Sequence, residues 1–322
     1  MKILVVGYNA FDVTVQVGPR WPAPDAKVEV PSIRIGGGGP AATAAVALAR
    51  LGAGVRLLTP LTDDEPGRLQ TRELRDAGVD LTWCPRPSGS VSPKAVILVD
   101  EVAATRTIFW SRGRLSLMDP AVVTAEMLSG IDLVYTDGHD VPAASAAATL
   151  ARERGLPVVM DAGSVRAGSA ELVALCTDVV SSRDFAPDLS GNRDPVRALA
   201  WLRNRGPARV AMTFGEQGVL GLKDDEPVVV PAFAVTVRDT TGAGDAFHAG
   251  YAFARGQGRS FGACLEFGAA VAALKCRGWG GRQTLPDLAE VEAFRTTGPR
   301  RPLGVDLQQW GPGEDSATTD FS

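Results

Sequence analysis

The sequence reads Asp239-Thr240-Thr241-Gly242-Ala243-Gly244-Asp245-Ala246-Phe247 at a junction between two regular segments. The preceding residues 231–237 alternate in hydrophobicity as in a strand, and residues 246–254 are mostly apolar, which is typical of a buried helix. Gly242 and Gly244 lack Cβ atoms, so backbone N–H groups can turn toward a ligand at the positive end of the helix dipole. The junction therefore predicts an anion site at the start of a helix.

Asp245 is the unexpected residue at such a site, because a carboxylate repels phosphate unless it has a chemical task. A carboxylate beside a phosphoryl site can accept the proton of an attacking hydroxyl, as in other kinases. The simpler interpretation is that Asp245 only stabilises the first turn of the helix, where aspartate is favoured, and that Asp239 is an ordinary turn residue. The residues alone leave both interpretations open.

The complete string resembles the C-terminal signature of the PfkB (ribokinase-like) carbohydrate kinases. That resemblance implies an ATP-dependent sugar kinase in which Asp245 is the catalytic base. It also implies that an anion hole for the transferring phosphoryl group is formed by Gly242, Ala243 and Gly244.

Length, composition and charge agree with an enzyme that acts on a small molecule. The 322 residues, 45% of them hydrophobic, suffice for a sizeable core in one large or two modest domains. A net charge of −4 gives no basic surface for nucleic acid or for an anionic membrane. No apolar run approaches the roughly 20 residues that span a bilayer, and no signal-peptide pattern is visible. The four cysteines form no Cys-x-x-Cys pair that would indicate zinc or a disulfide framework. We therefore expect a cytoplasmic protein.

Strand-like and helix-like segments alternate through most of the chain. They cover residues 55–61, 65–77, 133–136, 143–154, 158–161, 196–204 and 210–213. Such alternation predicts an α/β fold with a mainly parallel central sheet and helices on both faces. Together with the resemblance, it indicates a ribokinase-like three-layer α/β/α domain.

Residues 12–35 and 80–110 interrupt this alternation, because they contain alternating strand-like runs with little helix between them. They predict a small β-sheet. In PfkB kinases such a sheet is a lid over the sugar and, in some members, the surface of a homodimer. We therefore expect one kinase domain over residues 1–296, followed by a flexible C-terminal tail over residues 297–322.

The acceptor side is indicated by two features near the N-terminus. Asp12 follows the first strand-like run, and ligands gather at the carboxyl ends of strands in open α/β sheets. The run Gly36-Gly37-Gly38-Gly39-Pro40 precedes an alanine-rich, helix-forming segment. Considered alone, these are a strand-exit residue and a flexible loop. The resemblance implies that Asp12, Gly38 and Gly39 bind the sugar.

Thr43 departs from the family pattern, which usually has an asparagine at this position, so its contacts with the sugar must differ. The Gly-Gly-Pro-Ala-Ala-Thr form is similar to kinases of the 6-deoxy-6-sulfofructose type. Lys27 falls where those kinases have a lysine for the anionic end of the sugar, and His139 is a further substrate-binding candidate. A lysine that guards an edge strand and a structural histidine are the simpler interpretations of these two residues.

The nucleotide side is indicated by a buried strand that leads into a glycine turn, with Thr213, Gly215 and Gly218 in the family's Thr-x-Gly-x-x-Gly pattern. The resemblance also places Lys275 and Gly278, in an apolar helix and the loop after it, beside the nucleotide. Magnesium is expected with ATP, because it neutralises the β- and γ-phosphates during transfer.

Asp239 and Thr241 match positions that often help to bind a monovalent cation in this family. Potassium is therefore a further expected cofactor.

These observations predict an ATP-dependent kinase that phosphorylates a hydroxyl of a ketose or of an acidic sugar such as 6-deoxy-6-sulfofructose. A nucleoside kinase of the same fold would need an aromatic clamp for the base. A non-catalytic regulator that binds sugar or nucleotide is the alternative from another class, and the retention of Asp245 between its glycines argues against it.

Overall fold

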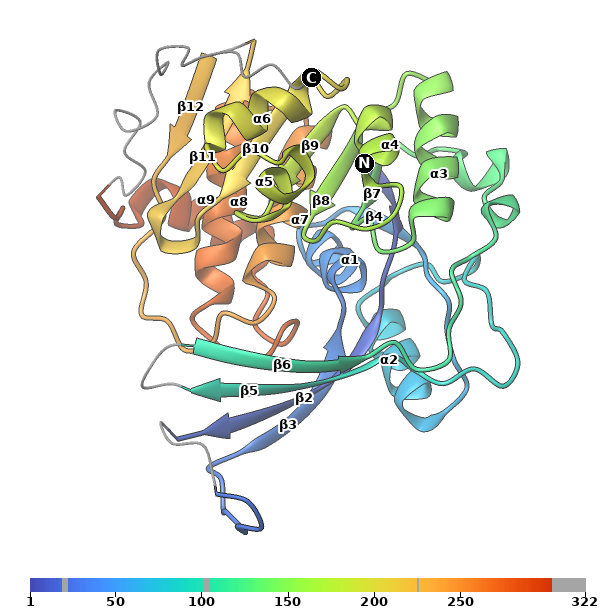
Figure 1. The fold of residues 1–322 in the computed structure, drawn as a ribbon, viewed down its shortest axis with the longest axis vertical. Coiled ribbons are helices and arrows are strands. Elements are labelled where there is room, and N and C mark those ends of the chain that lie inside the picture. The colour runs from blue at the N-terminus through green and yellow to red at the C-terminus, as the bar shows by residue number, and fades with distance from the viewer. Residues whose placement is uncertain (19–22, 101–104, 225, 303–322) are drawn as a thin grey trace, which may run out of the picture.

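The computed structural model describes residues 1–18, 23–100, 105–224 and 226–302, and an eight-stranded sheet forms its centre (Figure 1). Neighbouring strands from β10 to β4 are parallel, whereas β11 is antiparallel to both β10 and β12. In spatial order the strands are β12 (Glu226–Val230), β11 (Val219–Lys223), β10 (Arg209–Thr213), β9 (Asp178–Ser181), β8 (Val158–Ala162), β7 (Leu133–Thr136), β1 (Lys2–Val6) and β4 (Gly54–Leu58).

Helices cover both faces of this sheet, which confirms the predicted three-layer α/β/α architecture (Figure 1). On one side lie α1 (Pro40–Arg50), α7 (Ala243–Gly256), α8 (Phe261–Lys275) and α9 (Leu288–Thr297). On the other lie α3 (Val141–Glu153), α4 (Ser169–Leu175), α5 (Phe185–Ser190) and α6 (Pro195–Arg203). The helix α2 (Glu65–Asp76) packs near the strands β2 and β3 of a second sheet. No helix in the described ranges is long and apolar enough to cross a membrane.

The strand β1, which lies between β7 and β4 in the large sheet, shows why the core divides into two layers. Ile3 and Val5 pack into the cluster that contains α1, α7 and α8, whereas Leu4 and Val6 pack into the cluster that contains α3. A strand buried on both faces needs a continuous apolar run rather than an alternating one, and Ile3-Leu4-Val5-Val6 supplies it.

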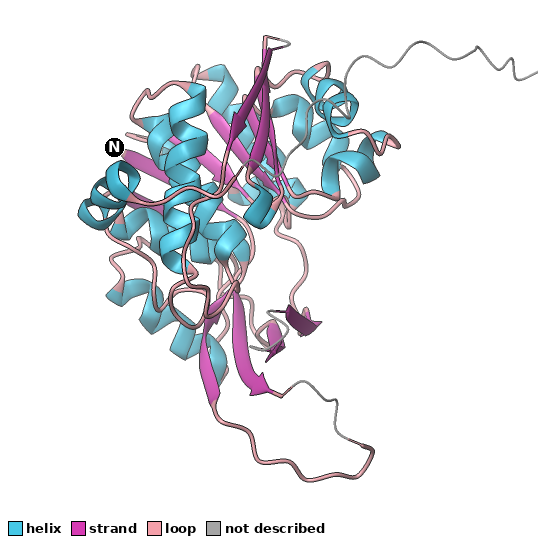
Figure 2. Cartoon of the chain, turned by 90° about the vertical axis from the view of Figure 1, so that its left-hand side faces the viewer, coloured by secondary structure: helices cyan, strands magenta, loops and turns pink. Residues whose placement is uncertain are grey.

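The second sheet is the predicted lid. It consists of β3 (Ile33–Gly38), β2 (Ala10–Val17), β5 (Lys94–Asp100) and β6 (Thr105–Ser111), in that spatial order. It lies across one end of the central sheet, and the connection between β2 and β3 projects away from the body (Figures 1 and 2).

The lid has two chemically different faces, because side chains alternate along each strand. The register pairs Val13 with both Ile35 and Val96, so these apolar residues share one face. Asp12 and Thr14 therefore lie on the opposite face of the lid, which is turned toward the body of the protein.

One predicted strand is wrong. Residues 231–237 form no strand, and Phe233 alone makes an isolated bridge, with Arg300. The strand β12 ends at Val230, and the next residue is Pro231, which has no N–H group to continue the hydrogen-bond ladder with β11. Residues 232–234 instead pair with residues 299–301, near the end of the described chain. Ala234 donates to the carbonyl of Pro299, and Arg301 donates to that of Ala232.

The predicted tail begins in this same region. Its first residues up to Pro302 are described, and those from 299 to 301 lie along residues 232–234. The remainder of the predicted tail, residues 303–322, lies outside the described residues.

Candidate active site

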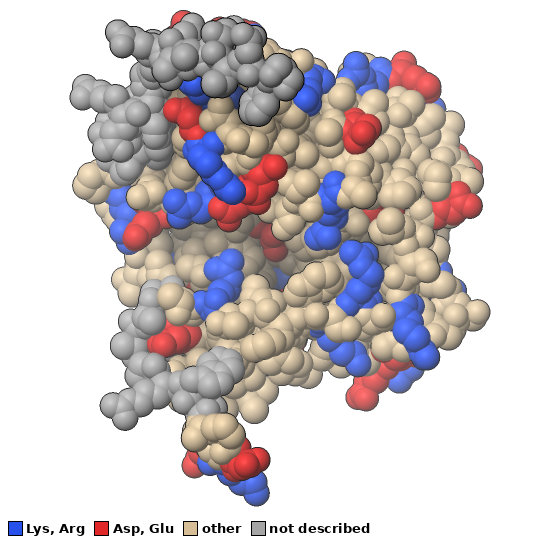
Figure 3. Space-filling view, in the orientation of Figure 1, with Lys and Arg blue, Asp and Glu red and all other residues tan. Residues whose placement is uncertain are grey.

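The site lies where the carboxyl ends of the parallel strands face the lid. The surface is hollowed between the two sheets, and acidic and basic side chains lie around the hollow (Figure 3). Asp245 enters it from the first turn of α7, and Asp12 enters it from the lid strand β2. The two carboxyl groups are near enough for each to influence the other electrostatically.

The start of α7 has the geometry of an anion site. Gly242 occupies the N-cap position with φ 72°, a left-handed conformation that favours glycine. A Cβ atom at Gly242 would lie 3.0 Å from the backbone of Gly281. Ala243 donates its N–H to the carbonyl of Thr240, but among the described residues no acceptor takes the N–H groups of Gly242 and Gly244. These two amides can therefore bind an anion, while the amide of Ala243 is already engaged.

Asp245 has an environment suited to a base near neutral pH. Burial and the charge of Asp161 raise the pKa of the Asp245 carboxyl to about 7, although His248 opposes the shift. One turn further along α7, His248 lies 3.2 Å from the carboxyl of Asp161, which also accepts a hydrogen bond of 3.0 Å from the hydroxyl of Tyr135.

The pair formed by His248 and Asp161 is buried behind Asp245. Burial lowers the pKa of His248 to about 4 and raises that of Asp161 to about 8. The pair therefore lies in a buried environment that disfavours the charged form of each group.

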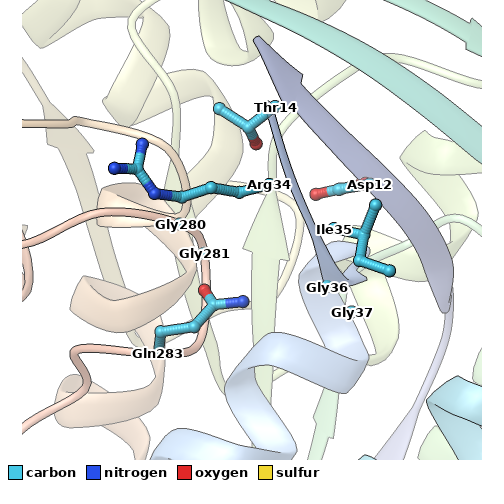
Figure 4. Close-up of a pocket in the computed structure, with 9 residues that line it drawn as sticks. All are labelled: Asp12, Thr14, Arg34, Ile35, Gly36, Gly37, Gly280, Gly281 and Gln283. Atoms are coloured by element: carbon cyan, nitrogen blue, oxygen red, sulfur yellow. The ribbon is translucent and has the colours of Figure 1, made fainter. Parts of the chain in front are cut away.

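A cavity of about 320 Å³ lies under the lid, next to the start of α7 (Figure 4). It is lined by Asp12, Thr14, Arg34, Ile35, Gly36, Gly37, Gly280, Gly281 and Gln283. Burial raises the pKa of Asp12 to about 7, with Arg282 lowering it and Asp245 raising it. Gly281 joins this cavity to the anion site, because it lies against both Gly242 and Gly37.

The predicted glycine pair, Gly38 and Gly39, directly follows Gly36 and Gly37, which line this cavity, and both of its members have close neighbours. A side chain at Gly38 would collide with the carboxylate of Asp12. Gly39 is the N-cap of α1, with φ 84°, and a Cβ there would lie 2.7 Å from the carbonyl oxygen of Tyr8. Gly38 therefore leaves room for the Asp12 carboxylate on the neighbouring strand β2, and Gly39 has a backbone conformation and a close backbone contact that favour glycine.

Arg282 is the central residue that the sequence analysis missed. It is buried, and its guanidinium donates to the carbonyl of Gly38, to Asn9 at 3.1 Å and to Thr43 at 3.3 Å. It also lies 3.7 Å from Glu73. Thr43, predicted to contact the sugar, is buried and serves as an acceptor for Arg282 in this structure.

Two predicted acceptor residues are not brought to the cavity that contains Asp12. Lys27 is exposed in the connection between β2 and β3. His139 stacks on Tyr8 at a centroid distance of 4.7 Å and accepts a hydrogen bond from Arg166. It lines a separate, smaller cavity with Arg112.

Of the residues predicted to bind the nucleotide, all but Lys275 lie at the end of a strand or in a loop. Thr213 ends β10, Gly215 begins the short 3-10 turn that follows, and Gly218 ends that turn with φ 104°. Gly278 lies in the loop after α8, against Thr284. Lys275, in contrast, is fully buried and donates to the carbonyl of Asp239, so it is not available to a nucleotide.

Residues 1–288 match the family described as pfkB family carbohydrate kinase. This chain belongs to the PfkB family. It is accordingly an ATP-dependent carbohydrate kinase, and the Asp239–Phe247 string that carried the resemblance lies at the start of α7, beside the cavity under the lid.

Similar proteins span nearly the whole chain. The ribokinase of Haemophilus influenzae is 26% identical over 300 residues, which cover 91% of this chain and 97% of that protein. The ATP-dependent ribose-1-phosphate kinase of Halopiger xanaduensis is 29% identical, with 91% and 98% covered. Among solved structures, Arabidopsis thaliana ribokinase complexed with ribose and ATP superposes with a TM-score of 0.78 at 24% identity, with 91% and 98% covered, and shows the common fold.

The PfkB site in this chain contains further residues that sequence reasoning did not find. Arg106, on the lid strand β6, donates a 2.8 Å hydrogen bond to Thr240 in the loop before α7. Asp161 lies at the carboxyl end of β8, so the strand-end argument applied to Asp12 could also have found it. Arg106, Arg282 and His248 carry no comparable signal, because only the folded chain brings them to the site.

Proposed function

We propose that this PfkB protein transfers the γ-phosphate of ATP to a hydroxyl of a small, acidic sugar, with Asp245 as the base. The observation that supports this most directly is the start of α7, where a carboxyl group with a pKa of about 7 stands beside the free amides of Gly242 and Gly244. A base with a pKa near the working pH combines a useful ionised fraction with sufficient proton affinity.

In the proposed reaction, the acceptor hydroxyl attacks the γ-phosphorus, and the bond from that phosphorus to the bridging oxygen of ADP breaks. The proton of the hydroxyl passes to the Asp245 carboxylate. The amides of Gly242 and Gly244 donate to the oxygens of the phosphoryl group, on which charge is spread in the transition state.

Magnesium, when bound, neutralises the phosphates, and its ligands are then mainly phosphate oxygens and water. Among the described residues there is no group of three acidic, histidine or cysteine side chains that could hold a metal.

Arg34 supports an acceptor with an anionic end. It lines the cavity under the lid (Figure 4). Its guanidinium stacks over the ring of Trp279, 4.4 Å from the ring centroid. Its guanidinium donates to Ser32, but no carboxylate among the described residues pairs with it. A guanidinium held in place without an acidic partner can bind phosphate, sulfonate or carboxylate on the far side of the sugar from the reacting hydroxyl.

The test is ADP release with a panel of ribose, fructose, their phosphates, 6-deoxy-6-sulfofructose and adenosine. We expect an acidic sugar to be the best acceptor. Arg34→Gln is then expected to raise the KM for that acceptor by roughly 10- to 100-fold, the value of one charge-assisted hydrogen bond, and to leave the KM for ATP unchanged. The exposed Arg72→Gln serves as the matched control. If Arg34→Gln raises the KM for ATP instead, Arg34 belongs to the nucleotide side.

A nucleoside is the second candidate acceptor, because the inner face of β6 presents an aromatic ring. Trp110 is 56% exposed, and the register places it and Ile108 on the lid face that is turned toward the body. The nucleoside kinase of Methanothermobacter thermautotrophicus is 25% identical over 90% of this chain. Preferential turnover of adenosine in the panel would support this alternative.

The outer face of the lid fits a second copy of the chain. Ile35 is 59% exposed on this face, and the register places Val13 between Ile35 and Val96. An exposed apolar sheet face is unfavourable in water, and a two-fold axis would bring two copies of it together. We therefore propose a homodimer through the lid.

A further inference from the structure

A fully buried lysine lies beneath the loop that leads into the anion site. Lys275 is the last residue of α8, and its Nζ donates a 2.9 Å hydrogen bond to the main-chain carbonyl of Asp239. A buried ammonium group is costly unless a hydrogen bond and a negative charge compensate for it. The main-chain carbonyl of Asp239 accepts that hydrogen bond, and the Asp239 carboxylate, buried in the same turn, supplies the negative charge.

Several oxygen atoms of this turn already accept hydrogen bonds. The Asp239 carboxylate accepts from the N–H of Thr241 and from that of Gly280, each at 2.8 Å. The carbonyl of Cys276 accepts from Asp239, and that of Lys275 accepts from the hydroxyl of Thr284 at 3.1 Å. Within the described part of the chain, Thr241 Oγ1 is the only buried side-chain oxygen of this turn without a partner.

These residues do not fit a potassium ion. Alkali cations in proteins replace their hydration shell with several carbonyl or carboxylate oxygens at once. Here the main-chain and carboxylate oxygens of Asp239 are occupied by an ammonium and two amide groups. Arg106 adds a second fixed positive charge beside Thr240, which further disfavours a mobile cation.

We propose that the Lys275 ammonium is itself the cation of this turn, so that the protein needs no potassium. Lys275 is a positioning residue: it fixes the carbonyl of Asp239, three residues before Gly242. Through that loop it holds the start of α7 in the conformation that binds the phosphoryl group. In this proposal, the Lys275 ammonium takes the place of the potassium ion expected at Asp239 and Thr241.

The experiment compares the unfolding midpoint Tm and the affinity for ADP in potassium, sodium and choline chloride at equal ionic strength, with the full chain. We expect both quantities to be the same in the three salts, within about twofold for the affinity. A Tm or ADP affinity that rises saturably in potassium alone would overturn the proposal. The Tm measurement needs no ligand, so it tests Lys275 even if ADP does not bind and the proposed kinase function fails.

Lys275→Met makes the test sharper by removing the charge while keeping a similar shape. We expect it to lower the Tm and to weaken ADP binding roughly tenfold in choline chloride, as for the loss of one charge-assisted hydrogen bond. Potassium is expected to restore part of both losses. A folded Lys275→Met protein that shows no specific response to potassium contradicts the proposal. Lys223→Met, at an exposed lysine of β11, is the matched control and should behave as the wild type.

Discussion

The titration of Asp245 gives the most direct test of the proposed chemistry. A carboxyl group with a pKa of about 7 is roughly 10% ionised at pH 6 and roughly 90% ionised at pH 8. Since only the ionised form accepts a proton, kcat/KM is expected to rise about tenfold between these pH values, with an apparent pKa near 7.

Asp245→Asn removes the proton acceptor but keeps the size and most of the polarity of the side chain. We expect kcat/KM to fall by roughly 100-fold or more, and the remaining activity to lose its rise with pH. ADP release is measured from pH 5.5 to 9 with the best acceptor of the panel, and circular dichroism together with ADP binding shows whether the variant is folded.

Asp12→Asn is the necessary control, because the pKa of Asp12 is also raised to about 7. Asp12 lines the acceptor cavity, so its removal is expected to raise the KM for the acceptor while the rise of kcat with pH remains. The base assignment is refuted if the rise with pH survives in Asp245→Asn and disappears in Asp12→Asn. It is also refuted if folded Asp245→Asn keeps near-normal activity.

The remaining predictions concern the loop before α7 and the lid. Gly242→Ala is expected to lower the free energy of unfolding by about 1–2 kcal/mol, because φ is 72° and the new Cβ meets the backbone of Gly281. Gly244→Ala should cost little, since its Cβ would be 4.0 Å from the nearest atom, His248 Cε1; equal losses in urea unfolding would contradict this difference. Ile35→Asp, on the outer lid face, is expected to convert a dimer into a monomer in sedimentation experiments, and a wild-type protein that is already monomeric would exclude the proposed dimer.

The alternation of strand-like and helix-like segments, together with the resemblance to PfkB kinases, was enough to predict the architecture. Buried parallel strands such as β1 carry continuous apolar runs, and helices such as α2 begin and end within a residue or two of the predicted bounds. The segment 231–237 was misread because its alternating pattern is that of a strand, although Pro231 cannot extend the ladder and the described chain offers it no partner in the central sheet.

The string from Asp239 to Phe247 indicated a helix start and an anion site by itself, whereas the assignment of Asp245 as the base depended on the resemblance to PfkB kinases. Those features depend on neighbouring residues in the chain, where glycine conformation and helix geometry act over a single turn. The acceptor cavity is different, because its walls come from the lid strands and from the loop around Gly280, which are far apart in the sequence.

Only the tertiary structure decided what the charged residues do. Lys27 and Lys275 have equal charge and both looked like ligand-binding residues, yet one is exposed in a lid connection and the other is buried against Asp239. Arg34 and Arg282 had no sequence signal; in the folded chain Arg34 lines the cavity under the lid, and Arg282 is buried against Thr43. A charge acquires its role from the partners and the burial that folding gives it, and a linear pattern contains neither.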